Sequence, residues 1–327
     1  MRTKPVKRYQ LLDGLRGVAA MTVMLGHLSS HSAHIGIFVD FFFVLSGFVL
    51  TKQIDSKATF RKRRFIINRI IRFYPMLIGV ILFVAISENL EILRNYLEIE
   101  THPVYFYIGS LFLIQIVYSP IIELNSPLWS LSAEFWINII AIFIVTKKQV
   151  LFFIWFGLFV YFAGIILSFY LNLSWQPWMY TFAIGRAMTG FFLGRLLGML
   201  ENSQFNPRNF AYILLLILLL VLVAFYESKY VILYIFGAPI SFLFIREILK
   251  IDERNVPNFV LYISSYIGKI SFGVYIWHYA IMQMTPNLNM WAQLVFCLAV
   301  VDVYCRFLEK RVRDFLEKVL LLPAVKN

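Results

Sequence analysis

The sequence predicts an all-α fold, a polytopic membrane bundle of about ten transmembrane helices with the N and C termini on the cytoplasmic side. Hydrophobic residues make up 60% of the 327-residue chain and charged residues 15%, whereas soluble domains average about 45–50% and about 25%. Mean hydropathy is +0.75, and a soluble fold would have to expose much of this apolar surface. Apolar runs of about 20 residues, the length that crosses a bilayer as a helix, recur with short connections. We therefore interpret residues 1–327 as a single transmembrane domain.

Ten apolar segments account for the expected spans. The first follows a basic start, as in a signal peptide, but it contains Asp13 and Arg16 and a second span follows at once, so we expect it to be retained. A shorter run at 105–118 fits a re-entrant or interfacial helix better than a full crossing. In chain order the ten spans are 17–34, 36–53, 73–90, 128–146, 150–171, 177–199, 210–226, 230–249, 259–282 and 288–306.

The distribution of basic residues sets the predicted orientation. Basic clusters occur at the N-terminus, at 51–72, at Lys147 and Lys148, and after the last span, whereas the stretch at 88–100 and the loop near 123–127 are acidic or polar. Basic loops stay on the cytoplasmic side, and an even number of spans keeps all of these clusters there. The same clusters account for most of the net charge of +12, so we expect no nucleic-acid partner. We expect a multi-pass protein of the inner (plasma) membrane, with the lipid bilayer as its surroundings.

Charged and imidazole side chains within the spans are the first candidate site residues, because each is costly in lipid. Arg16 and His27 lie eleven residues apart on the first span, which places them on one helical face, roughly 16 Å apart along the axis. His27 suits a general base, or a buried histidine bonded to a neighbouring helix. Asp40, at the start of the second span, is a candidate partner that would orient His27, or a helix N-cap. His27 and His31 have a zinc-compatible spacing, but no Cys or Glu accompanies them, so we expect no metal.

Further along the chain, Arg69 and Arg72 lie at i, i+3 just before the third span. Two neighbouring guanidiniums offer forked donors to phosphate oxygens, and the alternative is an anchor in anionic headgroups. Glu134, near Trp129, is either a titratable group in an unusual environment or a ligand for sugar hydroxyls. Together with Arg186, Lys269 and His278, these residues predict an internal cavity shared by several spans.

Five segments, RGVAAMTVMLGH, VDFFFVLSGFVL, RIIRFYP, PLWSLSAEFW and SFGVYIWHY, occur in the order found in the acyltransferase-3 family. The sequence resembles this family over nearly its whole length. Its members are multispan membrane enzymes that O-acylate extracytoplasmic carbohydrates and other acceptors. The resemblance implies that His27 is the essential histidine and Arg16 the arginine upstream of it. It also implies that Arg69 and Arg72 handle acyl-CoA, and that Asp40 and Glu134 are the family's acids. Phe135 replaces a second acid that many members have.

The resemblance implies an O-acetyltransferase that takes an acyl group, by expectation acetyl, from cytoplasmic acetyl-CoA. The acceptor would be a hydroxyl of an extracytoplasmic carbohydrate or glycolipid, with His27 as general base. We expect no permanently bound cofactor, since acetyl-CoA is a substrate. The alternative is a transporter or flippase of a glycan or lipid-linked substrate, which also has many spans and buried charges. The absence of an inverted repeat, or of matching helices broken by Gly or Pro, favours the enzyme.

Overall fold

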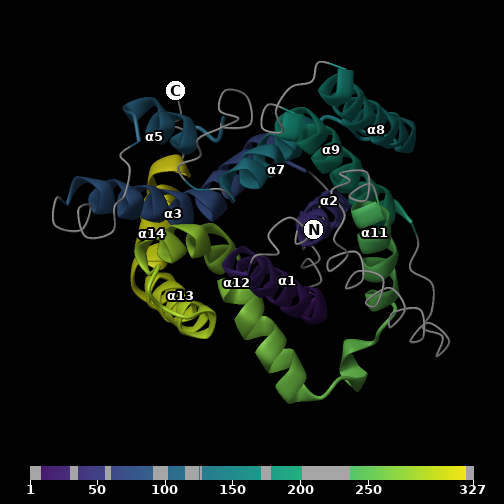
Figure 1. Ribbon diagram of the computed structural model, residues 1–327. Coiled ribbons are helices and arrows are strands. Elements are labelled where there is room, and N and C mark those ends of the chain that lie inside the picture. Colours follow the sequence, from purple (N-terminus) through teal and green to yellow (C-terminus); the bar gives the residue numbers. More distant parts are fainter. Residues whose placement is uncertain are drawn as a thin grey trace, which may run out of the picture.

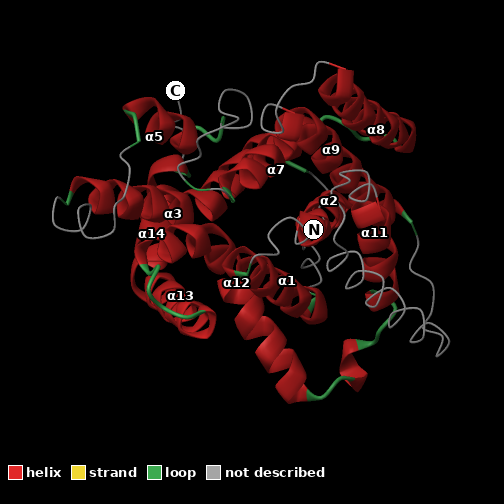
Figure 2. Cartoon of the chain, viewed as in Figure 1, coloured by secondary structure: helices red, strands yellow, loops and turns green. Residues whose placement is uncertain are grey.

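A computed structural model describes most of the chain, and every regular element within the described part is a helix (Figures 1 and 2). The described residues are 9–29, 36–55, 60–90, 102–114, 125, 127–170, 178–200 and 236–321, with only the backbone for 167–170 and 178–182. The helices are α1 (Gln10–Leu28), α2 (Gly36–Asp55), α3 (Lys62–Asn89), α5 (Val104–Leu111), α7 (Leu128–Ala141), α8 (Lys147–Tyr170), α9 (Trp178–Met199), α11 (Gly237–Ile248), α12 (Asn258–Met284), α13 (Met290–Tyr304) and α14 (Lys310–Leu320).

Six helical segments among the described residues are long and apolar enough to cross a membrane: Gln10–Leu28, Gly36–Asp55, Lys62–Asn89, Lys147–Ile166, Asn258–Met284 and Met290–Leu320. The protein is therefore a multi-pass membrane protein with an all-helical described fold. The predicted span at 210–226 and the first part of the one at 230–249 lie outside the described residues. The count of ten and the orientation of the termini thus stay predictions.

Two helix boundaries differ from the sequence-based ranges for clear reasons. α3 begins at Lys62 rather than residue 73, because the basic segment before the span continues as the same helix. The described part of the run at 105–118 ends at residue 114, and the helix in it is the eight-residue α5, which rises about 12 Å and is too short by itself to cross a hydrocarbon core of about 30 Å. After α5 the chain turns at Leu113, whose φ is 54°.

Close helix packing depends on small residues, as is usual within membranes. A Cβ on Gly17 would lie 2.8 Å from the carbonyl of Ile267, and a Cβ on Gly14 would lie 2.5 Å from Ser264 Oγ. α1 and α12 therefore touch along their backbones, and contacts advance together along both, so the helices run parallel. α2 and α9 are also parallel, since Gly47 packs on Phe191 and Gly198 on Thr51. The ten-span hypothesis requires these directions. Successive spans alternate in direction, so spans one and nine (α1 and α12) must be parallel, and so must spans two and six (α2 and α9).

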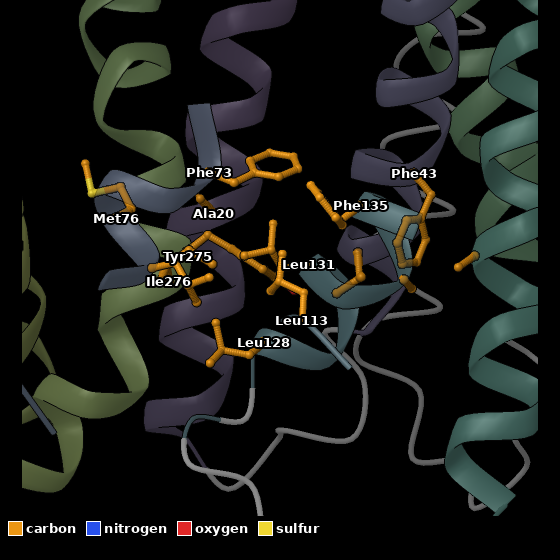
Figure 3. Close-up of a cluster of buried hydrophobic side chains, with 14 of the residues drawn as sticks. Ala20, Phe43, Phe73, Met76, Leu113, Leu128, Leu131, Phe135, Tyr275 and Ile276 are labelled. Atoms are coloured by element: carbon orange, nitrogen blue, oxygen red, sulfur yellow. The ribbon is translucent and has the colours of Figure 1, made fainter. Parts of the chain in front are cut away.

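An apolar core fills the space among α1, α3, α7 and α12 and forms part of the site wall (Figure 3). Phe73 of α3 lies between Phe135 of α7 and Phe272 of α12, with ring centroids 6.1 and 5.4 Å apart. At the end of this core, the Tyr304 hydroxyl donates to the carbonyl of Pro75 at 2.5 Å. Tyr304 is the last residue of α13, which continues through a π-helical turn, η3 (Cys305–Glu309), into α14. The core thus fixes α3 against α12 and the C-terminal helices.

Candidate active site

A cavity of about 390 Å³ lies among α1, α2, α3, α7, α12 and the C-terminal helices. Its apolar wall includes Phe42, Phe43, Phe73, Leu131 and Phe272. Its acidic and basic side chains are Asp13, Arg16, Arg69, Arg72, Glu134, Lys269, Glu309 and Arg313. Five of these are Lys or Arg and three are Asp or Glu, so the lining carries an excess of two positive charges. Such a lining favours an anionic ligand.

Arg69 is the most deeply placed cation of this cavity, with 4% of its surface exposed. Its Nη1 lies 3.8 Å from Glu134 Oε1, and its guanidinium lies over the rings of Phe65 and Phe73, 5.1 and 5.8 Å from their centroids. The Nη2 atom is buried and has no hydrogen-bond partner among the described residues. A buried donor without an acceptor is costly, so this atom is available to a ligand oxygen.

Arg72 lies one turn along α3 from Arg69 and is half-buried, with its guanidinium 5.9 Å from the Phe73 ring. Both arginines line the same cavity, as their i, i+3 spacing predicted. Lys269 reaches this cavity from α12. In the sequence, Lys269 was a candidate site residue because it is a charged side chain inside a predicted span. Arg313 of α14 also lines it, and sequence reasoning had treated this residue only as a topology signal.

Glu134 lines the cavity from α7 and is held by α2. Ser46 Oγ donates to Glu134 Oε1 at 2.7 Å, and Asn138 Nδ2 donates to Ser46 Oγ at 3.2 Å and to the Glu134 carbonyl at 2.8 Å. Trp129 does not join this network and packs against Phe43, with ring centroids 6.2 Å apart. Sequence reasoning missed Ser46, whose only signal is its place in the FFFVLSGF segment.

Arg16 bridges α1 to α12 at the cavity wall. Its Nε donates to Ser271 Oγ at 2.9 Å, its Nη2 donates to the Gly268 carbonyl at 2.6 Å, and Nη2 lies 3.4 Å from Asp13 Oδ1. Two of the guanidinium nitrogens thus bind the neighbouring helix α12. Arg16 therefore orders the helix pair as well as adding charge to the cavity.

The cavity lining also includes Tyr9, which precedes α1. Glu253, in the 3-10 turn before α12, accepts a hydrogen bond from the Leu11 amide at 2.9 Å and thereby satisfies one of the free donors at the start of α1. Burial, together with the Glu253 carboxylate, raises the pKa of the Tyr9 phenol. Tyr9 is therefore a neutral hydrogen-bonding group of the cavity lining.

Asp40 does not pair with His27, so the expected Asp40–His27 pair is wrong. Arg186 of α9 donates from Nε to Asp40 Oδ1 at 2.6 Å and from Nη2 to Oδ2 at 2.9 Å. The cause is the parallel packing of α2 on α9, which turns the buried carboxylate toward a forked donor. Arg186 Nη2 also donates to the carbonyl of Gly36. Arg186 had been noticed as a charge within a span, but not as the partner of Asp40.

His27 lies beyond the cavity, toward the other end of α1. Eleven residues separate it from Arg16, which is roughly 16 Å along a helix. Its ring stacks on His278 of α12 with centroids 5.3 Å apart and an interplanar angle of 30°. Tyr279 approaches it edge-on at 6.1 Å. Of the six predicted site residues, Arg16, Arg69, Arg72 and Glu134 therefore share the cavity, whereas His27 and Asp40 do not line it.

No cluster of three or more His, Cys, Asp or Glu side chains that could hold a metal occurs among the described residues. His31, which has the zinc-compatible spacing with His27, lies outside the described residues. The candidate site therefore has two parts: a cationic, partly apolar cavity, and a separate pair of imidazoles, His27 and His278.

Residues 9–301 match the acyltransferase domain family that forms the acyltransferase-3 group. The chain belongs to this family. It is similar to the peptidoglycan O-acetyltransferase OatA of Listeria monocytogenes, with 26% identity over 92% of this chain and 55% of the relative. It is also similar to a putative O-acetyltransferase of Staphylococcus aureus strain COL, with 22% identity over 89% of this chain and 54% of the relative.

The chain thus spans about half the length of these curated relatives. A shorter match joins 26% of the chain to protein 2 in the picA locus of Rhizobium radiobacter, with 35% identity. No solved structure matches the chain. The protein is therefore a multi-pass membrane member of the acyltransferase-3 family, and this membership favours the enzyme over the transporter.

Proposed function

We propose that this acyltransferase moves an acetyl group from acetyl-CoA, bound on the cytoplasmic side, to a hydroxyl of an extracytoplasmic carbohydrate. One observation carries the proposal. A cationic cavity lies near one end of α1 and contains the buried Arg69 Nη2, which has no hydrogen-bond partner in the part of the chain that the structure describes; the imidazole of His27 lies further along the same helix.

The cavity suits the phosphate-bearing end of the donor. Phosphate oxygens accept forked hydrogen bonds from guanidinium groups, which bind them more specifically than an ammonium does. Arg69 and Arg72 would hold these oxygens, with Lys269 as an additional positive charge. The apolar wall at Phe42 and Phe43 would contact the pantetheine arm, which is long enough to run from this end of the bundle toward His27.

The expected chemistry at His27 is general-base catalysis. The acceptor hydroxyl oxygen attacks the thioester carbonyl carbon, the new C–O bond forms, and the C–S bond breaks. His27 takes the hydroxyl proton as the oxygen attacks, and the CoA thiolate then receives that proton. A relay through an acyl-histidine would use the same residue as nucleophile.

The acceptor class follows from the relatives by analogy. The printed names of the relatives describe O-acetyltransferases, one of them acting on peptidoglycan. We therefore infer a carbohydrate of the cell envelope as acceptor, and the inner (plasma) membrane as the location. The described cavity lining contains no feature that selects one sugar over another.

The direct test incubates purified protein in detergent with radiolabelled acetyl-CoA and a short N-acetylglucosamine oligosaccharide. We expect label in the oligosaccharide, or slow release of acetate without it, and loss of both in His27→Ala. Val18→Leu, on an exposed face of the same helix, is the matched control and keeps the activity. An active His27→Ala variant would exclude His27 as the base, and no turnover by the wild type would exclude acetyl-CoA as donor.

A further inference from the structure

No carboxylate among the described residues orients the His27 ring. Asp40, the expected partner, is fully buried and bound at both oxygens by Arg186. A general base works only when its lone pair points at the proton to be removed, and an imidazole on a single helix rotates about two side-chain bonds. Something else must therefore fix the ring.

α12 supplies the contacts to this ring. His278 stacks on it with centroids 5.3 Å apart, and Tyr279 meets it edge-on at 6.1 Å. Aromatic rings at such distances attract one another in stacked and edge-on arrangements. The two α12 residues therefore contact His27 in two different directions, which is what limits its rotation.

His278 is itself held rigidly. It has no exposed surface, and its Nδ1 lies 3.1 Å from the carbonyl of Val274, one turn earlier on the same helix. That carbonyl can only accept a hydrogen bond, so Nδ1 carries the hydrogen. Its Nε2 is buried and has no hydrogen-bond partner among the described residues. His278 thus contacts His27 with the face of its ring rather than with an edge.

The register of the two helices brings the rings together. Gly14 and Gly17 of α1 meet Ser264 and Ile267 of α12 at backbone distance, and Arg16 bonds across to the Gly268 carbonyl. His27 comes eleven residues after Arg16, and His278 comes ten residues after Gly268. Because the helices are parallel, His27 and His278 lie at nearly the same position along the helix axes. The packing that forms the cavity wall therefore also stacks the two imidazoles.

We propose that His278 is the positioning residue of the acyl-transfer site, which orients the His27 imidazole by ring stacking in place of a carboxylate. The inference rests on the proposed role of His27 as base. As His27 gains a proton in the transition state, a neighbouring aromatic face also stabilises the developing cation. Removing the ring should therefore lower kcat rather than donor affinity.

Three variants at this position separate stacking from other roles. His278→Leu keeps an apolar side chain but removes the ring, and we expect kcat to fall at least about a hundredfold, the usual scale for misplacing a catalytic group. His278→Phe keeps a ring and should stay within about tenfold of wild type. His278→Gln places an amide near the Nε2 position without a ring and should resemble Leu. Gln283→Leu, on an exposed part of α12, is the control.

Acetyl-CoA affinity, the thermal midpoint and kcat are measured for each variant in detergent, with His27→Ala alongside. Support requires unchanged donor affinity and thermal midpoint, a lowered kcat in the Leu and Gln variants, and rescue of kcat by Phe. A Phe variant as inactive as Leu, or a Gln variant more active than Phe, would overturn stacking and assign the role to Nε2. A fully active Leu variant would also overturn it. Full activity of His27→Ala would instead overturn the proposed function, and this inference with it.

Discussion

Two buried arginines differ in what their guanidinium groups bind. Arg186 donates to both oxygens of Asp40 and has 6% of its surface exposed. Arg69 is as deeply buried, but its nearest carboxylate oxygen, on Glu134, is 3.8 Å away and its Nη2 has no partner among the described residues. A satisfied buried pair belongs to the structure, whereas a buried donor without an acceptor belongs to a ligand site. The two residues therefore predict different effects of substitution.

Substitution of Arg72 and Arg69 tests the donor site. Arg72→Ala should weaken acetyl-CoA binding by about 1–3 kcal/mol, the scale of a charge-assisted hydrogen bond. Lys at the same position should restore only part of this, because an ammonium cannot make a forked contact. Donor affinity in detergent is the measurement, and Arg63→Ala, exposed in the same basic run, is the control. Equal affinity in wild type, Arg69→Ala and Arg72→Ala would move the donor site elsewhere.

Substitution of Asp40 tests a structural role for the pair with Arg186. Asp40→Ala leaves the Arg186 charge buried without its partner, so the free energy of unfolding should fall by about 3–5 kcal/mol. The double variant Asp40→Leu/Arg186→Met should recover most of this, since apolar replacement of a buried pair is often neutral. Thermal unfolding in detergent measures both. If the double variant is stable yet inactive, Asp40 also serves the reaction.

At the scale of elements, packing decides which polar residues meet. The sequence pattern placed these charged residues on their helices. The cavity shared by Arg16, Arg69, Arg72 and Glu134 is formed where three of those helices, α1, α3 and α7, meet. The partner of Asp40 did not follow, because period and spacing describe one helix at a time. α2 has many small and aromatic residues on several faces, so only its contact with α9 determines where Asp40 points. His278 was visible as a histidine within a span, but its stack on His27 depends on the register of α12 against α1.

That register is the subject of a prediction about Gly17. A larger side chain there collides with the backbone carbonyl of Ile267 rather than with a flexible side chain, so α1 and α12 must separate. We expect Gly17→Leu to abolish acetyl transfer and to lower the thermal midpoint by several degrees. Val18→Leu adds similar bulk at the adjacent position, which is 48% exposed, and should change neither. Wild-type activity in Gly17→Leu would show that the close contact is dispensable.

At the scale of the whole molecule, the parallel pairs α1 with α12 and α2 with α9 agree with the directions that ten alternating spans impose. The prediction of a membrane bundle rested on composition and on recurring apolar runs, and it is confirmed by six apolar helices among the described residues. The number of spans does not follow in the same way, because the 14-residue α7 is only a few residues shorter than a crossing helix of about 20.

Cysteine labelling tests the orientation. After replacing the buried Cys297 and Cys305, a cysteine at Arg254 should react only from the cytoplasm, and one at Leu288 only from outside. Both side chains are exposed, at 89% and 43%. Labelling of both positions from the same side would contradict the ten-span hypothesis.

The distance between the cationic cavity and the imidazole pair has an electrical consequence. The charged phosphates of the donor would remain with the arginines at one end of the bundle, and only the neutral acetyl group, on its uncharged arm, would reach His27. Moving one elementary charge across a membrane changes its free energy by about 2.3 kcal/mol per 100 mV, whereas a neutral group does not respond to the field. Acetyl transfer by this protein in sealed vesicles should therefore proceed at the same rate whether or not a membrane potential is applied.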